Sequence, residues 1–391
     1  MRAMASRLAV ILLFSSTAPG QRSLWIVDPS GGSGSHYTSL QVAADAAQVL
    51  PGDVLQLYPG THAALTTSKP LVLIGDSSCL LPSVSVANLP PGTEFVIAGC
   101  TAIPPVPAPG GAWGMWLTLS NCQGRVVVAD VAYYSGGVFP QLILVRLITA
   151  TDCPDLELAN VIATGGGVSL LRCRATLLHC AFRPALGNRP LIGIDALVSD
   201  QSHLEVVDTP LRGSPGSVLQ GGRGATILGG SACFRATGSG LGSLQGGSGP
   251  PPTTALQIQA ADVRVSPSVT VVGAVQNTGG TYTVADLPAL ATLYAANQIS
   301  TSLFAPAGTP AVLAIGFALP PTPWGTFGTL RLDPGLALSA VAGVVATGNP
   351  LASSKPVPPG IQFFGTQFAA QGLALVGGQT VLSNGATFLI R

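Results

Sequence analysis

The chain has 391 residues, of which 17 are basic and 16 acidic, and 47% of its residues are hydrophobic. The near-zero net charge gives no electrostatic basis for binding nucleic acid or an anionic membrane, and the apolar content excludes a disordered chain. The 49 glycines and 33 prolines also exclude long helices, because both residues interrupt them. We therefore expect an all-β protein of short apolar strands separated by turns, and the length favours two domains.

The first 20 residues have the pattern of a signal peptide. Arg2 and Arg7 provide a positive start, residues 8–14 are an apolar run, and residues 18–20 are a small-residue cleavage site. The apolar run is shorter than the roughly 20 residues that a bilayer requires, and no later stretch is long and apolar enough to act as a transmembrane anchor. We expect the protein to be secreted, at the cell surface or periplasmic.

One segment near the N-terminus has a helical pattern. Thr38 and Gln41 fit a capping box, in which side chains satisfy the free backbone donors of the first turn. Pro51 and Gly52 end the helix. The apolar residues expected on its buried face are Leu40, Ala43, Ala47 and Leu50.

Short apolar segments followed by a cysteine recur through the next part of the chain. Successive cysteines lie 21, 22, 31 and 20 positions apart, and periods of about 20 to 30 residues occur in solenoid proteins. Each interval is interpreted as one rung, and the interval of 31 as a rung with a loop inserted around residues 133–139. The cysteines concerned are Cys79, Cys100, Cys122, Cys153 and Cys173.

These cysteines allow two interpretations. Rungs in register place them about 4.8 Å apart, within the Cα separations of about 4.4 to 6.8 Å that a disulfide requires. The pairs Cys79–Cys100 or Cys100–Cys122, and Cys153–Cys173, are then allowed. A stack of unpaired thiols packed as small apolar residues is the favoured alternative. The chain has an odd number of cysteines, seven, and a chain of this length does not need disulfides for stability.

The opening of the mature chain resembles a known family. The resemblance rests on Asp28, on residues 37–41, 46–47 and 51–53, on the Tyr-Pro-Gly-Thr run at 58–61, and on residues 73–75. Together they are similar to secreted right-handed parallel β-helix repeat proteins of the pectate-lyase-like type from planctomycete-like bacteria. His62 stands where that family usually has a tyrosine.

The resemblance implies a domain organisation. We expect a signal peptide at residues 1–20, a right-handed parallel β-helix with an N-terminal capping helix at 21–283, a linker at 284–302 and a small C-terminal β-sandwich at 303–391. The sandwich resembles one attached to many of these secreted proteins, through residues 367–371 and 382–384. Its expected role is to cover the open last rung of the β-helix.

One cluster of charged residues is a candidate for glycan cleavage. Hydrolysis requires a pair of carboxylates, and lysis requires carboxylates that hold Ca²⁺ and a basic residue that removes a proton. Three acidic residues lie on one rung and two arginines about one rung later, namely Asp152, Asp155, Glu157, Arg172 and Arg174. The paired aspartates and Gly-His-Gly sequence of the hydrolases are absent, as is a lyase arginine motif. A solvated turn is the favoured interpretation, and no catalytic, cofactor or metal residue is assigned.

Other chemistry-bearing residues give weaker patterns. No histidine has a partner at metal-ligand spacing; the four are His36, His62, His179 and His203. Aromatic residues form either a sugar-binding platform or ordinary packing, with packing favoured. These are Trp113, Trp116, Tyr133 and Tyr134.

The sequence as a whole favours an exported, non-catalytic β-helix that acts as an extracellular or cell-surface scaffold. A further hypothesis is that this scaffold binds a glycan. The alternative is a polysaccharide lyase or glycoside hydrolase of the pectin-degrading β-helix type, which would use Ca²⁺ if it is a lyase. The expected partner is an extracellular polysaccharide rather than nucleic acid, and the expected state is a monomer.

Overall fold

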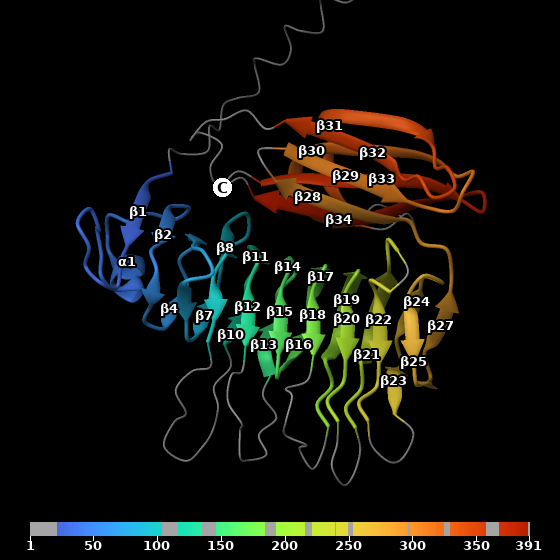
Figure 1. Cartoon of the computed structure of the whole chain (residues 1–391), viewed down its shortest axis with the longest axis horizontal. Helices are drawn as coiled ribbons and strands as arrows, with labels where there is room; N and C mark the ends of the chain where they lie inside the picture. Colours follow the sequence, from blue (N-terminus) through green and yellow to red (C-terminus); the bar gives the residue numbers. More distant parts are fainter. Residues whose placement is uncertain are drawn as a thin grey trace, which may run out of the picture.

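The computed structural model describes residues 22–103, 116–134, 146–183, 193–215, 221–238, 240–248, 253–295, 298–323, 329–356 and 367–389. In these residues the protein is all-β with one short helix, as the composition predicts (Figure 1). The predicted signal peptide at 1–20 lies outside them. Helical structure in the described residues never reaches the length and apolarity that a bilayer crossing demands.

Parallel strands stack in successive coils from β1 to β27. Each strand pairs in parallel with its counterparts one coil before and one coil after; β8, for example, lies between β5 and β11. The described part of the stack contains an 18-stranded and a nine-stranded parallel sheet. The larger sheet consists of two rows of strands, which we call face A and face B, and the smaller sheet is face C. This arrangement is compatible with a parallel β-helix.

The three faces have the following strands. Face A contains β4 (Leu65–Thr67), β7 (Val84–Ala87), β10 (Leu117–Ser120), β13 (Arg146–Thr151), β16 (Gly167–Leu171), β23 (Thr254–Gln259) and β26 (Ala274–Thr278). Face B contains β1 (Leu24–Val27), β2 (Val54–Leu57), β5 (Val72–Ile74), β8 (Glu94–Ala98), β11 (Arg125–Ala129), β14 (Leu156–Ala159), β17 (Arg174–Leu178), β24 (Asp262–Val265) and β27 (Thr281–Val284). β19 (Leu197–Val207) and β21 (Ala225–Arg235) continue from face A into face B. Face C contains β3 (Gly60–Thr61), β6 (Cys79–Leu81), β9 (Thr101–Ala102), β12 (Ala132–Tyr134), β15 (Ile162–Thr164), β18 (Ala181–Arg183), β20 (Pro210–Arg212), β22 (Ser243–Gln245) and β25 (Thr270–Val272).

The core of the stack is built from columns of like apolar side chains. Strand pairing places one such residue directly on the next, and one column on face B is fully buried. Burial of each aliphatic side chain of this kind contributes roughly 1.5–3 kcal/mol. The column consists of Leu73, Ile97, Val128, Leu158 and Leu177.

Residues with left-handed backbone turn the chain from face to face. Positive φ recurs at the corner between faces A and B, and again at the corner between faces B and C. Asn and Asp tolerate this conformation better than other non-glycine residues, and they occupy most of these positions. The first corner contains Asn88, Asn121, Asp152, Arg172 and Gln201, and the second contains Asp130, Asn160, His179 and Asp208.

None of the seven cysteines, all of which lie in the described residues, forms a disulfide, and the five singled out from the sequence lie in two separate columns. Cys122, Cys153 and Cys173 follow the A–B corner on successive coils and contact one another, which is the favoured stack. Cys79 and Cys100 instead lie near the B–C corner. The expected adjacency of Cys100 and Cys122 is wrong, because after Cys100 the chain passes through faces C and A before it reaches the corner of Cys122.

The helix α1 (Leu40–Asp45) is shorter than expected. Its N-cap is Ser39, whose hydroxyl accepts a hydrogen bond from the Val42 amide, rather than Thr38. The Lys69 ammonium binds the carbonyls of Ala46 and Val49, which follow the helix, at 3.1 and 2.9 Å.

Only part of the expected apolar face of α1 is buried. Leu40 and Ala43 are buried, but Leu50 is 58% exposed. The expectation that Leu50 belongs to this face is wrong, because the helix ends at Asp45 and the 3.6-residue period does not extend beyond it.

Two antiparallel sheets follow the stack. One contains β28 (Ala289–Ala295), β29 (Gln298–Phe304) and β32 (Leu351–Pro356), and the other β31 (Thr329–Val344), β30 (Pro310–Pro323), β33 (Gln367–Val376) and β34 (Gln379–Leu389). They share an apolar core that includes Leu290, Leu303, Ile315 and Phe368. Strands β28 and β29 occupy most of the expected linker at 284–302, so the antiparallel part begins earlier than residue 303.

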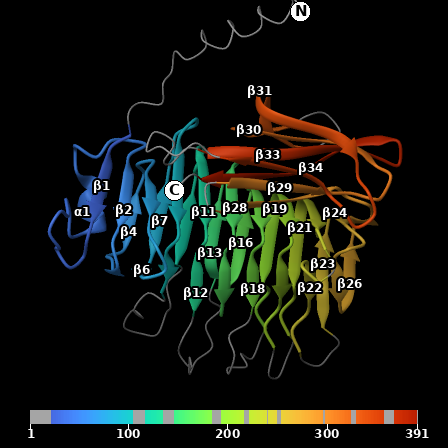
Figure 2. The same ribbon diagram turned by 45° about the horizontal axis from the view of Figure 1, so that its top comes forward.

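The C-terminal sheets lie along face B rather than beyond the last coil (Figures 1 and 2). Leu178 and Val207, whose side chains point outward from face B, belong to the same apolar cluster as Leu290. The expectation that this part covers the open end of the stack is therefore wrong. The outer side of face B offers apolar and charged partners, whereas the last coil has no charged side chain.

Free thiols give a direct test of this core. When the chain is unfolded without reductant, a thiol reagent should titrate all seven cysteines. The native protein should react slowly, because six of the seven are buried. A count of five or three in the unfolded chain would show disulfides and contradict the thiol columns.

Candidate functional site

Strand register gathers charged residues on the outer side of face B. Because coils are about 4.8 Å apart, residues at equivalent positions form rows across the strands. One row runs through Glu94, Arg125, Asp155, Arg174, His203, Ser231 and Asp262. The next runs through Glu157, Thr176, Glu205, Cys233 and Arg264. In a chain with 8% charged residues, this is a concentrated polar surface.

The five charged residues singled out from the sequence fall into two places. Asp155, Glu157 and Arg174 lie on face B. Asp152 and Arg172 lie at the A–B corner, where the guanidinium binds both carboxylate oxygens at 2.6 and 2.8 Å. Their side chains are 40% and 49% exposed. The structure thus separates this solvated pair from the residues on face B.

Asp155 and Glu157 form a buried ion-pair network with two arginines. Arg331 of β31 donates to Asp155 at 2.5 Å and to the Thr176 hydroxyl at 2.9 Å. Arg125 donates to Glu157 at 2.9 Å and lies 4.0 Å from Asp155. Asp155 and Glu157 are 5% and 1% exposed, so two carboxylates and two guanidiniums compensate one another away from water.

The C-terminal sheets contribute a second contact to this network. The Thr387 hydroxyl of β34 donates to the free oxygen of Glu157. Together with Arg331, it ties β31 and β34 to the outer side of face B. The network therefore acts as the polar part of the joint between the coils and the C-terminal sheets.

The charges of the network shift the pKa values of neighbouring groups. Burial alone would lower the pKa of the Arg125 guanidinium, but the charges of Glu157, Asp155 and Glu94 outweigh it and raise that pKa. Burial raises the pKa of the Glu94 carboxyl, although Arg125 opposes the effect. Arg125 is therefore a permanent cation whose role is to hold carboxylates.

A polar groove lies beside the network, between face B and the C-terminal sheets. Its volume is about 260 Å³. The coil side is lined by Arg174, Ala175, Thr176, His203, Leu204, Glu205, Ser231, Cys233, Asp262 and Arg264, and the opposite side by Thr329, Arg331, Ser383, Asn384 and Gly385. Cations, anions and hydroxyls all occur in the groove, which suits a ligand with many hydrogen-bonding groups.

Two features of the groove bear on its chemistry. His203 Nδ1 lies 2.8 Å from the Ser231 hydroxyl, and the two residues pair directly between β19 and β21. Burial raises the pKa of the Cys233 thiol to about 11, so this sulfur is a neutral thiol at neutral pH. Since the thiolate is the nucleophilic form, Cys233 is poorly suited to nucleophilic catalysis.

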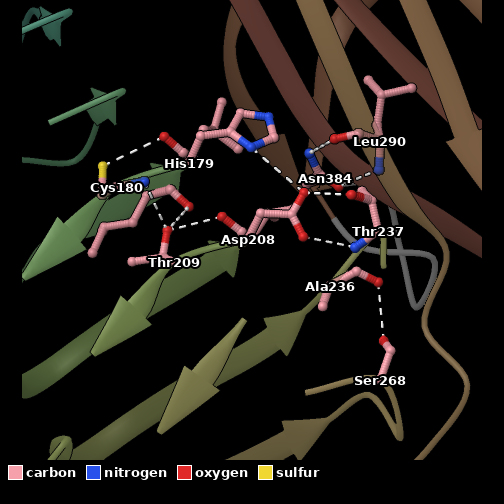
Figure 3. Close-up of polar contacts among 12 residues, drawn as sticks. His179, Cys180, Asp208, Thr209, Ala236, Thr237, Ser268, Leu290 and Asn384 are labelled. Atoms are coloured by element: carbon pink, nitrogen blue, oxygen red, sulfur yellow. Dashed lines mark hydrogen bonds and ion pairs between the residues drawn. The ribbon is translucent and has the colours of Figure 1, made fainter. Parts of the chain in front are cut away.

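Polar side chains also form a ladder at the B–C corner (Figure 3). The buried Asp208 carboxylate accepts hydrogen bonds from the Thr237 amide at 2.7 Å and its hydroxyl at 2.5 Å, and lies 3.5 Å from His179 Nδ1. Two coils before Asp208, Asn160 donates to Asp130 of the coil that precedes it at 2.8 Å. The partners of the Asp208 carboxylate, His179 and Thr237, lie at the same corner of the two neighbouring coils, so the ladder has a structural role.

The remaining residues singled out from the sequence lie elsewhere. Trp116 is fully buried in the core and Tyr133 is 4% exposed in β12, so neither offers a sugar platform and Tyr133 is not in an inserted loop. Trp113 lies outside the described residues. Within the described residues, no group of three His, Cys, Asp or Glu side chains is placed to hold a metal ion.

Several residues of the groove and the network were not singled out from the sequence. Arg125, Ser231, Asp262, Arg264 and Arg331 join it only through the register of the coils and the docking of the C-terminal sheets. An alignment of coils at the positive-φ corners would have placed the first four in rows. Nothing in the local sequence around Arg331 indicates its partner.

Comparison with known proteins adds no assignment. A scan against protein-family models finds no match, and no curated protein matches the chain. The site must therefore be interpreted from its own geometry.

The network predicts a large effect of Arg331→Met. Removal of this guanidinium leaves Asp155 buried without its closest partner, and such a change costs about 3–5 kcal/mol. Urea unfolding should show the loss as a lower midpoint. The matched control is Arg172→Met, which breaks an exposed arginine–aspartate pair and should leave the midpoint unchanged. Equal effects of the two substitutions would contradict a buried joint.

Proposed function

We propose that the protein is an exported right-handed parallel β-helix that acts as a non-catalytic extracellular scaffold and binds a polysaccharide in the groove beside its C-terminal domain. In this proposal α1 caps the first coil, and the two antiparallel sheets are a small β-sandwich docked on face B. The in-register coils and the apolar face of α1 in the main core support this architecture.

The engagement of Asp155 and Glu157 is the observation that carries the scaffold proposal. A catalytic carboxylate has to reach the reacting bond and exchange a proton with it. Both side chains are buried, and their closest partners are Arg331, Arg125 and Thr387. The acids that the sequence offers for catalysis thus hold the two parts of the protein together.

The polar groove supports the binding part of the proposal. Sugars present hydroxyls that both donate and accept, and Arg174, Glu205 and Arg264 provide matching charged partners. A volume of about 260 Å³ is close to the lower end of the roughly 300–1,000 Å³ range of small-molecule sites. It suits one sugar residue of a chain, with the rest of the polymer outside.

The alternative function, a polysaccharide lyase or glycoside hydrolase, would have to use different acids. Glu205 and Asp262 line the groove, whereas Asp155 and Glu157 do not. Glu205 is in β19 and Asp262 is in β24, and β21 lies between these two strands. The backbones of the two acids are therefore about 9.6 Å apart. If the protein is a lyase, Ca²⁺ is required for turnover.

Binding and turnover can be separated with one panel of polysaccharides. Affinity electrophoresis in gels that contain acidic or neutral polysaccharides should show retardation by at least one of them. Arg264→Gln should weaken that binding about tenfold, because a hydrogen bond to a charged group contributes about 1.5 kcal/mol. Arg172→Gln, remote from the groove, is the matched control and should bind as the parent protein does.

The same polysaccharides test the enzyme alternative. Assays for reducing ends and for unsaturated products, with and without Ca²⁺, should show no turnover. Turnover that Glu205→Gln or Asp262→Asn abolishes would overturn the scaffold proposal in favour of catalysis. If none of the polysaccharides retards the protein, the proposal that it binds a polysaccharide is wrong.

A further inference from the structure

The last coil of the stack has open strand edges. Among the described residues, β25 pairs only with β22, β26 only with β23 and β27 only with β24. The other edge of each strand therefore presents backbone N–H and C=O groups without a strand partner. Figure 2 shows β26 at the end of the stack that lies farthest from α1.

The core is open at the same end. Val271, Tyr282 and Val284 continue the inward columns, since they pair with Leu244, Val263 and Val265. Those three residues of the preceding coils are at most 2% exposed, whereas Val284 is 57% exposed. Val271, Tyr282 and Val284 thus form an apolar surface at the end of the stack, which we call the apolar floor, and open strand edges surround it.

This end lacks two of the usual protections against strand pairing, charge and proline, although the pairing of β23 with β26 is irregular between Thr254 and Leu256. Natural proteins place charges, proline or bulges on free edges. Strands β25, β26 and β27 contain neither a charged residue nor a proline, and residues 268–285 carry no charge at all. The composition of this coil permits association instead of preventing it.

We propose that two copies of the chain associate end to end through their last coils, related by a two-fold axis perpendicular to the stack. Such an axis reverses strand direction, so the open edges of one copy pair antiparallel with those of the other and the two apolar floors close one continuous core. A two-fold contact brings identical surfaces together, and a surface without charge meets its own copy without repulsion. This proposal replaces the monomer expected from the sequence and does not depend on the proposed function.

The opposite end of the stack does not offer an equivalent surface. There Val27 of β1 forms a bridge with Tyr37, and α1 packs Leu40 and Ala43 into the core. A head-to-tail filament would require this end to accept the open coil. The structure therefore favours a closed dimer rather than a filament.

Sedimentation velocity of the full chain tests the dimer. At about 50 µM, well above a micromolar dissociation constant, the parent protein should sediment with the mass of two chains. Val284→Lys places a charge on the exposed floor and should reduce the mass to that of one chain. Thr278→Lys, on the exposed β26 edge, should do the same without any change in the core.

Leu338→Lys is the matched control, because Leu338 is 61% exposed on β31 and far along the chain from the last coil. It should leave the two-chain mass unchanged, and circular dichroism should show that all variants are folded. A parent protein with the mass of one chain at this concentration would overturn the proposal. So would a dimer that neither Val284→Lys nor Thr278→Lys weakens, or assembly beyond two chains.

Discussion

Parallel pairing in register between successive coils is the constraint on which the rest of the structure depends. Each coil places its residues directly on the equivalent residues of the previous coil. A single substitution therefore changes the packing of the residues before and after it in the same column. Inward positions therefore become columns of aliphatic side chains, as in Leu73, Ile97 and Val128. Corner positions become columns of Asn and Asp at positive φ. Outward positions on face B become rows of charge.

The rows of charge would be unfavourable if like charges met one coil apart. Instead, Glu94, Arg125 and Asp155 alternate in sign along their row, and Arg331 enters from the C-terminal sheet to compensate the remaining carboxylate charge. A buried ion pair is not a strong source of stability compared with apolar packing. Here the contacts of Arg331 with Asp155 and of Thr387 with Glu157 connect the C-terminal sheets to face B at defined positions. The apolar contacts of Leu178 and Val207 provide burial, and the ion pairs fix where that burial occurs.

Much of the coil stack could be predicted from the sequence because its information is local. Gly, Pro and Asn mark turns, and short apolar runs between them indicate strands. The columns were harder to predict, since the interval from Cys100 to Cys122 has nearly the length of the others but ends at a different corner. The carbonyls of Ala46 and Val49 after α1 bind Lys69, which is 23 and 20 positions away along the chain. The pairing of Arg331 with Asp155 spans 176 positions, and no spacing or propensity rule reaches that far.

The distribution of charge links the joint, the groove and the open end. With 17 basic and 16 acidic residues in 391, charge is scarce, yet face B has it in adjacent rows while residues 268–285 have none. A stack of coils must protect or occupy its free edges, and charged side chains are the simplest protection. Here the charged rows lie beside the C-terminal sheets, where they bind Arg331 and line the groove. The last coil, which carries no charge and has an exposed apolar end, is then suited to a partner that completes its strands, and a second copy offers the same uncharged strand edges and the same apolar end.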